Sequence, residues 1–244
     1  MTSPGTLAVR SLGVRVGARW IVHDVSFDAR PGDITALIGP NGAGKTTLFE
    51  GVVGLRAVQT GSIAFDGRPL RAFADFARTF AFLPDAGILP PEASVHTLVE
   101  HAVSRSARPF ALQRLREALA IDPLLSKLAG VLSRGEHQRV ALFCTLALGR
   151  PVIVLDEPFS TFDPLQLRGV LSIVREFAAE STTVLASIHQ LSDAQKVADR
   201  FLILVDGKKL AFGDLASLRS AVGEGPVSLE DVFVSLLEGA SRAS

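Results

Sequence analysis

The segment "GPNGAGKTT", at residues 39–47, constrains the fold of this chain more than any other part of the sequence. It follows the apolar run "ITALI" and precedes the helix-forming run "TTLFEGVVG", so it joins a strand to a helix. It fits the pattern G-x-x-x-x-G-K-[ST], whose glycines let backbone N–H groups turn toward one anion, aided by the positive end of the helix. The segment predicts a phosphate-binding loop, with Lys45 reaching the β- and γ-phosphates of a nucleotide and the Thr46 hydroxyl facing Mg²⁺.

A second segment, "VIVLDEP" at residues 152–158, is an apolar strand that ends in two carboxylates. By itself this is weak evidence, because many strands end in polar loops. As the partner of a phosphate loop it has a specific chemistry. Asp156 is suited to hold Mg²⁺ through water, and Glu157 is suited to take a proton from an attacking water molecule.

Strand and helix patterns alternate along the chain. Short strands are predicted in the first and last thirds, for example in "VSFDARPGD", "TTVLASIHQ" and "RFLILVDGKKLAFGD", whereas residues 92–148 lose strand character. Strands that are apolar throughout predict a mainly parallel, buried sheet, with the helical middle inserted between two parts of one core. The tail "PVSLEDVFVSLLEG" predicts an amphipathic helix with a capping box from Ser228 to Asp231. Its apolar face holds Leu229, Val232, Phe233, Leu236 and Leu237.

Composition narrows the class of protein. Hydrophobic residues make up 48% and charged residues 20% of the 244 residues, which is typical of a globular chain. The 25 basic and 25 acidic residues balance, so charge gives no reason to expect nucleic acid or an anionic membrane as a partner. The single cysteine, Cys144, fits a reducing compartment, and none of the five histidines has the spacing of a transition-metal site. Without a signal-peptide pattern or an apolar run of membrane-spanning length, we expect a cytoplasmic protein.

A helix start lies between the two chemical segments, in "LSRGEHQRVAL" at residues 132–142. Ser133 with Glu136 three residues later forms a capping box, which is a structural explanation for both residues. A helix N-terminus that carries a serine and a glycine is also an anion site. The residues alone leave both interpretations open.

The order of these segments resembles that of the ATP-binding cassette (ABC) ATPases. A phosphate loop is followed by Leu-Ser-x-Gly-x-x-Gln-Arg, by an apolar strand ending in Asp-Glu-Pro, by "STFD", and by a strand ending in histidine. The resemblance covers nearly the whole chain, from "VHDVSFDARPGD" to "FGD". It implies an α/β fold in which a P-loop NTPase core with a mainly parallel sheet carries an antiparallel β subdomain on its N-terminal side and an inserted α-helical subdomain.

The resemblance also implies roles for single residues, with ATP and Mg²⁺ as the cofactors. Glu157 would be the catalytic base and His189, otherwise an ordinary surface histidine, the switch that senses the γ-phosphate. Thr46, Asp156 and Asp85 would face Mg²⁺. Ser133 and Gly135 would contact the γ-phosphate on an opposite subunit, and Asp163 would communicate across the dimer. The residues implied in nucleotide binding are Gly39, Pro40, Asn41, Gly42, Ala43, Gly44, Lys45, Thr46, Thr47, Ser133, Gly135, Asp163 and Val16.

Two departures from the family pattern concern nucleotide contacts. The family places an aromatic residue, often tyrosine, before the phosphate loop to stack on adenine, but this chain has no tyrosine and has Val16 at that position. Trp20, four residues later, is the alternative, although it could equally pack in the sheet. Residues 132–136 resemble the family's LSGGQ signature, in which Arg134 and Glu136 replace the usual glycine and glutamine. Since Ser133 and Gly135 remain, we expect the anion site to survive.

A third departure is in "RTFAFLPDAG", residues 78–87. The family ends this strand with a glutamine that ligates Mg²⁺ and couples to the membrane partner, and this chain has Asp85 there. A turn would explain a proline followed by an aspartate. Our hypothesis is that the Asp85 carboxylate belongs to the Mg²⁺ shell, where oxygen ligands of either kind are acceptable.

The sequence therefore predicts the ATP-binding and ATP-hydrolysing subunit of an ABC transporter. A single cassette without a membrane span implies separate permease subunits, which would hold the chain at the inner face of the cell membrane. Two cassettes, as a homodimer or heterodimer, would close around two ATP molecules. The tail "SLEDVF" resembles cassettes of exporters, which favours export over import. The alternatives are a soluble ABC ATPase, for example of iron-sulfur assembly, and a module that holds ATP without turnover, against which the intact Glu157 and His189 argue.

We expect one domain over residues 1–244. Residues 1–84 and 150–220 would form the ATP-binding core, residues 85–149 the helical signature subdomain, and residues 221–244 a helical tail.

Overall fold

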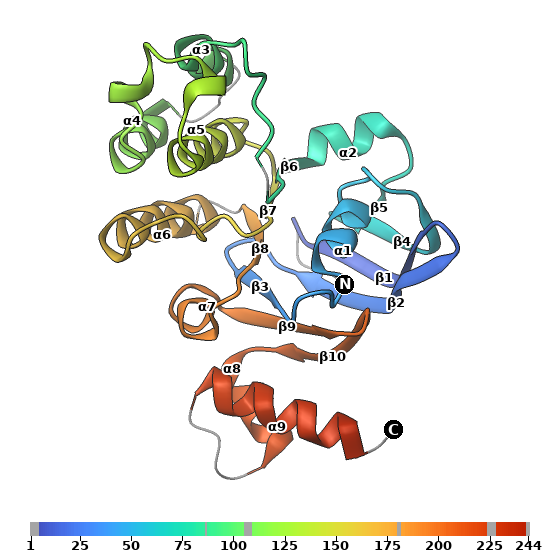
Figure 1. Ribbon diagram of the computed structural model, residues 1–244. Coiled ribbons are helices and arrows are strands. Elements are labelled where there is room, and N and C mark those ends of the chain that lie inside the picture. The colour runs from blue at the N-terminus through green and yellow to red at the C-terminus, as the bar shows by residue number, and fades with distance from the viewer. Residues whose placement is uncertain (1–4, 86, 105–108, 180–181, 224–227, 243–244) are drawn as a thin grey trace.

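The computed structural model describes residues 5–85, 87–104, 109–179, 182–223 and 228–242, and its strands join in one ten-stranded sheet (Figure 1). The order of the strands across the sheet is β5-β4-β1-β2-β10-β9-β3-β8-β7-β6. The strands are β1 (Leu7–Val16), β2 (Arg19–Ala29), β3 (Ile34–Ile38), β4 (Val58–Phe65), β5 (Arg68–Pro69), β6 (Phe80–Leu83), β7 (Val152–Leu155), β8 (Thr183–Ser187), β9 (Arg200–Val205) and β10 (Lys208–Gly213).

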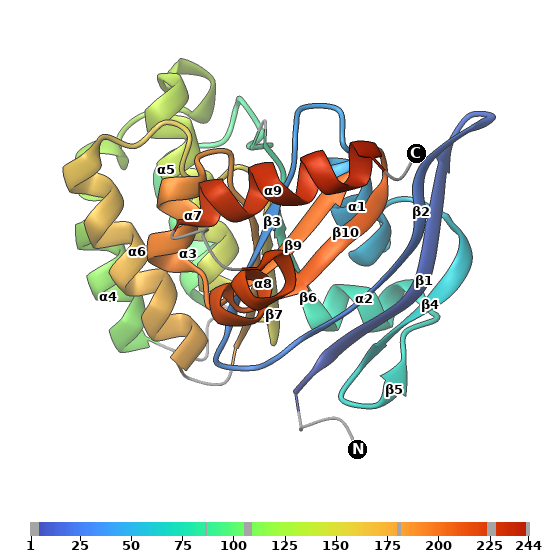
Figure 2. The same ribbon diagram turned by 90° about the horizontal axis from the view of Figure 1, so that it is seen from below.

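Helices cover the sheet and extend beyond its β6 edge (Figures 1 and 2). Helices α3, α4 and α5 lie together in both views and are here called the helical group, and α6 lies next to them. The helices are α1 (Lys45–Val52), α2 (Phe73–Thr79), α3 (Val95–Ser104), α4 (Pro109–Ala118), α5 (Arg134–Ala147), α6 (Pro164–Ala179), α7 (Leu191–Val197), α8 (Leu215–Val222) and α9 (Leu229–Arg242). Two short 3-10 helices precede α5, at Asp122–Leu124 and Ala129–Val131.

The sheet has a parallel half and an antiparallel half. Strands β3, β8, β7 and β6 are parallel to their neighbours, and β9 is parallel to β3 but antiparallel to β10. Strands β5, β4, β1 and β2 pair antiparallel with one another. Strand β2 joins the two halves through one parallel pair with β10, His23 to Lys208. This arrangement confirms the predicted α/β fold, with its antiparallel part formed by the N-terminal strands.

The parallel strands are buried on both faces, as their apolar sequences predict. In β7, Val152 and Val154 belong to a core cluster shared with α1, β1 and β2, while Ile153 and Leu155 belong to a cluster shared with the helical group. Alternate side chains of a strand point to opposite faces, so one strand connects both cores. The ends of these strands are therefore held rigidly.

The helical group is inserted between two neighbouring strands. The chain leaves the sheet after β6, forms α3, α4 and α5, and returns in β7, which pairs with β6. Leu112 and Leu115 on α4 and Leu119 directly after it are buried in its core. In the tail, Leu229 and Val232 are fully buried and Ser228 with Asp231 forms the predicted capping box. Among the described residues, no helix has the length and hydropathy needed to cross a membrane.

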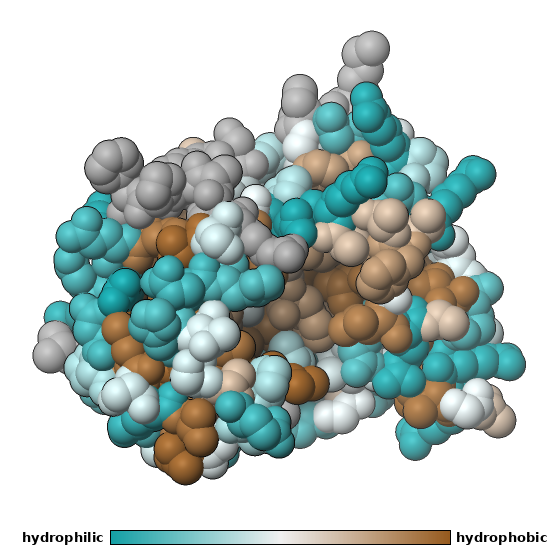
Figure 3. Space-filling model, turned by 90° about the horizontal axis from the view of Figure 1, so that it is seen from above, coloured by the Kyte–Doolittle hydropathy of each residue, from teal (hydrophilic) through white to brown (hydrophobic). Residues whose placement is uncertain are grey.

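One face of the molecule is hollowed between α2 and the helical group. Figure 3 shows apolar side chains gathered around this hollow. Three large apolar residues on the segments that border it are strongly exposed: Leu55 after α1 (66%), Phe73 at the start of α2 (80%), and Ile88 between β6 and α3 (81%). We call these three residues the apolar rim.

Candidate active site

The parallel half of the sheet brings the predicted chemical segments to one edge. Strands β3, β8 and β7 are consecutive neighbours, and each ends at a predicted functional residue. The phosphate loop follows β3, Asp156 follows β7, and His189 comes two residues after β8. Because the carboxyl ends of parallel strands lie at the same edge, segments distant in sequence meet there.

The loop after β3 has the backbone that its glycines permit. Gly42 and Gly44 have φ angles of 80° and 96°, which side-chain-bearing residues rarely adopt. A Cβ at Gly39 would lie 2.1 Å from the Leu204 carbonyl oxygen, so only glycine fits there. The Ala43 N–H donates to the Pro40 carbonyl at 3.1 Å and closes the turn, while Asn41 is exposed and Thr47 lies in the first turn of α1.

Lys45 begins α1 and is buried inside the loop, with 7% of its surface exposed. Its Nζ donates to the carbonyl oxygens of Gly39 at 2.9 Å and Pro40 at 3.2 Å. Burial lowers the pKa of Lys45, and the nearby carboxylates of Glu157 and Asp156 oppose part of that shift. A partly desolvated ammonium gains most from an anion placed beside it.

Asp156 is fully buried and accepts hydrogen bonds on both carboxylate oxygens. The Thr46 hydroxyl donates to Oδ2 at 2.6 Å, and the Ser187 hydroxyl donates to Oδ1 at 2.6 Å. Ser187 also accepts from the Glu157 N–H at 2.8 Å. A set of oxygen atoms from Thr46 and Asp156 beside the loop matches the preference of Mg²⁺ for oxygen ligands.

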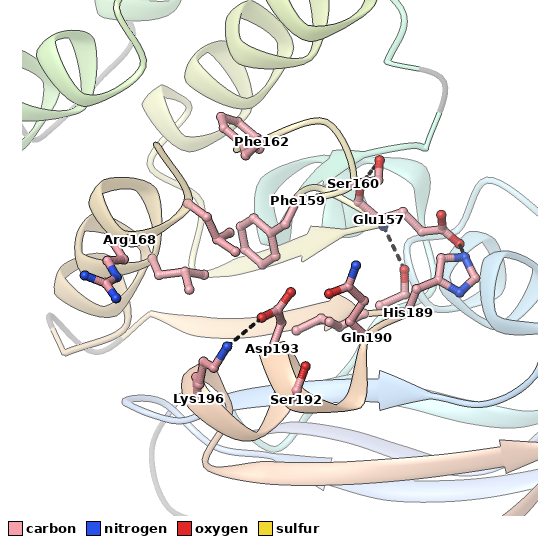
Figure 4. A pocket seen from close by; sticks show the side chains of 14 residues that line it. Glu157, Phe159, Ser160, Phe162, Arg168, His189, Gln190, Ser192, Asp193 and Lys196 are labelled. Carbon is pink, nitrogen blue, oxygen red and sulfur yellow. Dashed lines mark hydrogen bonds and ion pairs between the residues drawn. The ribbon is translucent and has the colours of Figure 1, made fainter. Parts of the chain in front are cut away.

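Glu157 contacts His189 directly, with Oε1 2.5 Å from His189 Nε2 (Figure 4). The side chain of Glu157 is 22% exposed and that of His189 is 41% exposed, so the pair faces solvent at the edge of the sheet. Glu157 has a φ angle of 51°. Such a backbone costs a residue with a side chain about 1 to 3 kcal/mol and persists only where its surroundings hold it.

A cavity of about 670 Å³ opens beside this pair, between the first turns of α6 and α7 (Figure 4). Phe159 and Phe162 form part of its apolar wall. Asp193 and Lys196 line it as an ion pair at 3.0 Å. The cavity gives the Glu157–His189 pair access from solvent.

The N-terminus of α5 carries the predicted signature. The Ser133 Oγ accepts from the Glu136 N–H at 3.3 Å, and the Glu136 Oε2 accepts from the Ser133 N–H at 2.9 Å, so the predicted capping box is present. Lys127 lies 2.7 Å from the other Glu136 oxygen. The hydrogen bond from Lys127 has the largest effect and that from the Ser133 N–H the next largest, and together they lower the pKa of Glu136 to about 2. The charge of Glu136 is therefore paired with Lys127.

The signature helix lies apart from the phosphate loop of its own chain. In both views α5 belongs to the helical group, whereas α1 lies beside β1 and β2 (Figures 1 and 2). A Cβ at Gly135 would lie 3.9 Å from the Thr161 carbonyl oxygen, so the signature instead borders the loop before α6.

Comparisons with known proteins identify the family. A family model described as "ABC transporter" matches residues 22–160, which is more than half of the chain. The chain belongs to the ABC transporter family. The ATP-binding protein EcsA of Bacillus subtilis is 30% identical over 226 residues, covering 88% of this chain and 90% of EcsA. A thiamine import ATP-binding protein, ThiQ of Vibrio vulnificus, is 34% identical over 207 residues, covering 79% and 85%.

The solved structures agree with this assignment. A structure described as the ATP-binding subunit of an ABC transporter aligns with a TM-score of 0.85 at 30% identity, covering 95% of this chain and 99% of that one. This chain is thus an ATP-binding subunit of the ABC transporter family, and the family hydrolyses ATP.

Asp163 and Asp85, two further residues of the ABC ATPase pattern, lie on loops near this edge. The Asp163 Oδ1 accepts from the Gln166 N–H at 2.9 Å and caps α6. Asp85 is exposed and follows β6, whose residue Leu83 accepts a hydrogen bond from the Asp156 N–H at 2.8 Å. The structure therefore brings the Asp85 segment next to Asp156, in a turn closed by Gly87 N–H on the Pro84 carbonyl.

The hairpin between β1 and β2 carries the positions considered for adenine. Val16 ends β1 and is 44% exposed. Trp20 lies under the guanidinium of Arg15, whose Cζ is 4.2 Å from the ring centroid. Ile21 on the same strand approaches the loop, since a Cβ at Gly44 would be 3.1 Å from the Ile21 carbonyl oxygen. The hairpin thus borders the phosphate loop, with one face of the tryptophan covered.

Sequence reasoning missed two residues of the site, Ser187 and Lys127. Ser187 is a polar residue at the end of a fully buried strand and two residues before His189, and that position was a usable signal. Lys127 gave no local signal, because it is nine residues from Glu136 and outside the helix that it stabilises.

Proposed function

We propose that this subunit binds Mg²⁺ and ATP at the loop of residues 39–47 and that Glu157 activates the water that attacks the γ-phosphate. The observation that carries the proposal is the meeting of Lys45, Thr46, Asp156, Glu157 and His189 at one edge of the parallel sheet. A phosphate cradle, oxygen ligands and a base within a hydrogen-bonded network are the components that phosphoryl transfer to water needs.

Each residue has a role that its position suits. The loop N–H groups and Lys45 bind the phosphates, and bound Mg²⁺ would neutralise charge on them. Thr46 and Asp156 would hold that ion, since their oxygens are adjacent and a hydroxyl that donates to a carboxylate keeps lone pairs for a metal. Glu157 takes a proton from water, and His189 orients Glu157 and reads the γ-phosphate.

The substitution Glu157→Gln tests this role. Turnover should fall by about 100-fold or more, the usual range for loss of a general base, while ATP binding persists. Steady-state phosphate release and equilibrium nucleotide binding measure the two effects. Glu117→Gln, an exposed position on α4, is the matched control. Equal rates for Glu157→Gln and the parent would remove Glu157 from the mechanism.

A complete site is proposed to need a second cassette, identical or related. Ser133 and Gly135 lie on α5, away from the phosphate loop of their own chain, so their anion site would serve ATP on a partner. Two such contacts in a head-to-tail pair would enclose two ATP molecules, with Asp163 near the shared boundary. Light scattering of the Glu157→Gln variant with and without ATP tests this, because the proposed closure predicts a dimer only when ATP is present.

The permease is proposed to dock on the apolar rim. Figure 3 shows apolar side chains gathered around the hollow between α2 and the helical group, and Leu55, Phe73 and Ile88 are large, apolar and strongly exposed on the segments that border it. Such a gathering of exposed apolar side chains is typical of a surface that binds a partner. A permease docked there would hold the chain at the inner face of the membrane. In the proposed division of the chain, residues 85–149 form the helical signature subdomain, residues 1–84 and 150–220 form the ATP-binding core, and residues 221–244 form the tail.

Export is the proposed direction of transport. The support is the sequence "SLEDVF" in the tail, which resembles the tails of exporter cassettes. Helix α9 of this tail packs on the core through Leu229 and Val232. Relatives named for import, such as ThiQ, match the chain as well. Uptake assays in inside-out membrane vesicles containing the permease test the direction, because ATP-dependent accumulation inside such vesicles indicates export.

A further inference from the structure

Ser187 connects the two carboxylate residues of the site through one hydroxyl group. It ends β8, and none of its surface is exposed. A backbone N–H can only donate, so the Ser187 oxygen accepts from the Glu157 N–H at 2.8 Å. Its single hydrogen is then directed to Asp156 Oδ1, at 2.6 Å. Strand β8 thereby binds the side chain of Asp156 and the backbone of Glu157 together.

The Asp156 carboxylate is fixed by two hydroxyls from different elements. Thr46 lies in the first turn of α1 and holds Oδ2, while Ser187 ends β8 and holds Oδ1. Rotation of the carboxylate would break both bonds in a fully buried position, where unpaired oxygen atoms are unfavourable. Ser187 therefore sets the plane in which Asp156 presents its oxygens.

The Glu157 backbone depends on the same hydroxyl. Its φ angle of 51° is unfavourable for glutamate, and the bond from its N–H to Ser187 opposes relaxation to a common conformation. This backbone angle determines the direction in which the Glu157 side chain leaves the chain, and that side chain meets His189 at 2.5 Å. A change at Ser187 would consequently displace Glu157 relative to His189.

We infer that Ser187 is a positioning residue for ATP hydrolysis, which fixes the Asp156 carboxylate and the Glu157 backbone with one hydroxyl group. The inference rests on the proposed function. Ser187 acts through two other residues, so its loss should slow turnover and raise the Mg²⁺ requirement more than it weakens binding of the nucleotide phosphates, which Lys45 and the loop hold.

Three substitutions distinguish the effect of losing the Ser187 hydroxyl group from the effect of changing the size of the side chain. Ser187→Ala removes the oxygen, while Ser187→Thr and Ser187→Val add nearly equal volume and differ in whether a hydroxyl is present. Loss of partners behind a metal ligand typically costs about 10- to 100-fold in activity or metal affinity. We expect kcat to fall by that factor in the alanine and valine variants, the Mg²⁺ concentration for half-maximal turnover to rise, and the threonine variant to recover most of both.

A second measurement needs neither ATP nor metal. In the nucleotide-free protein, amide hydrogen exchange at Glu157, followed by NMR, should be at least ~10-fold faster in Ser187→Ala and Ser187→Val and near the parent rate in Ser187→Thr. Thr183→Val is the control, because it removes a buried hydroxyl from the opposite end of β8, where Thr183 bonds to the Gly5 carbonyl at 3.1 Å. This control should leave turnover and exchange at Glu157 unchanged.

The outcomes distinguish this inference from the function on which it rests. A threonine variant no better than the valine variant in kcat and in exchange overturns the inference, and so does an alanine variant equal to the parent. Absence of ATPase activity in the parent protein with Mg²⁺ would instead remove the proposed function, and the exchange measurement would still report whether the Ser187 hydroxyl holds Glu157.

Discussion

Several charged side chains in this site are held in place by hydrogen bonds on more than one side, and Asp156 is the clearest case. Its two oxygens are held by Thr46 and Ser187, so its orientation is set before any nucleotide arrives. Lys45 is likewise held by two loop carbonyls. Groups fixed in this way need little reorganisation when charge develops during a reaction.

Substitution of Asp85 tests whether its carboxylate belongs to the metal shell. Our hypothesis places its carboxylate near the metal, so Asp85→Gln should change the Mg²⁺ concentration for half-maximal turnover by about 10-fold, the low end for a group near a metal ligand. Turnover measured across a Mg²⁺ titration reports the change, with Asp85→Ala as the variant that lacks any oxygen. If both variants keep the parent titration curve, Asp85 is only a turn residue.

Among the elements, α5 shows how a sequence change is compensated elsewhere. Glu136 replaces a neutral residue of the signature, but Lys127 and the Ser133 N–H both bind its carboxylate. The negative charge is thus paired within the helix cap, which supports our proposal that the N-terminus of α5 binds an anion.

Glu136 gives a prediction about stability and pH. Its pKa falls from the ordinary 4.5 to about 2, so the ionised form stabilises the fold above pH 4.5 and this contribution is lost as pH falls toward 2. Glu136→Gln should lower the free energy of unfolding at pH 7 by about 0.2 to 1 kcal/mol, the range for an exposed ion pair screened by solvent. Denaturant titrations at several pH values should find this difference shrinking below pH 4.5. A difference that is constant down to pH 2 would contradict the assignment.

The apolar rim and the nucleotide site lie near the same segment of the chain. Ile88 follows Asp85 by three residues, after the strand that pairs with β7. A partner bound at the rim would therefore contact a segment that continues directly to the catalytic edge of the sheet.

The rim gives a prediction about membrane binding. Phe73→Asp and Ile88→Asp should each weaken association with permease-containing membranes by about 30-fold, the equivalent of losing a residue worth about 2 kcal/mol at an interface. Sedimentation with membrane vesicles measures it, and ATPase activity without the permease should not change. Val234→Asp, on α9 and 52% exposed, is the control. Unchanged sedimentation of both rim variants would remove the rim as the docking surface.

Much of this arrangement was predictable because it is encoded locally. The loop glycines, the apolar strand ending at Asp156 and the capping boxes at Ser133 and Ser228 each involve residues within a few positions. The short helix α2 was not predicted, because seven residues provide little periodicity.

The bonds of Ser187 and Lys127 were also beyond sequence reasoning. Ser187 is 31 residues from Asp156, and only the pairing of β7 with β8 brings them together. The position of β10 between β2 and β9 likewise depends on long-range pairing. Such contacts need the three-dimensional order of the strands.

The insertion of the helical group between β6 and β7 has a mechanical consequence. These strands are parallel, so the chain leaves at the carboxyl end of one and returns at the amino end of the other, roughly 13 Å apart for strands of four residues. A body joined at two points rotates most easily about the line between them. Gly87 and Gly149, with φ angles of 49° and 59°, lie near the two joints. Rotation about this axis would carry Ser133 through an arc while Asp85, near one joint, stays almost in place.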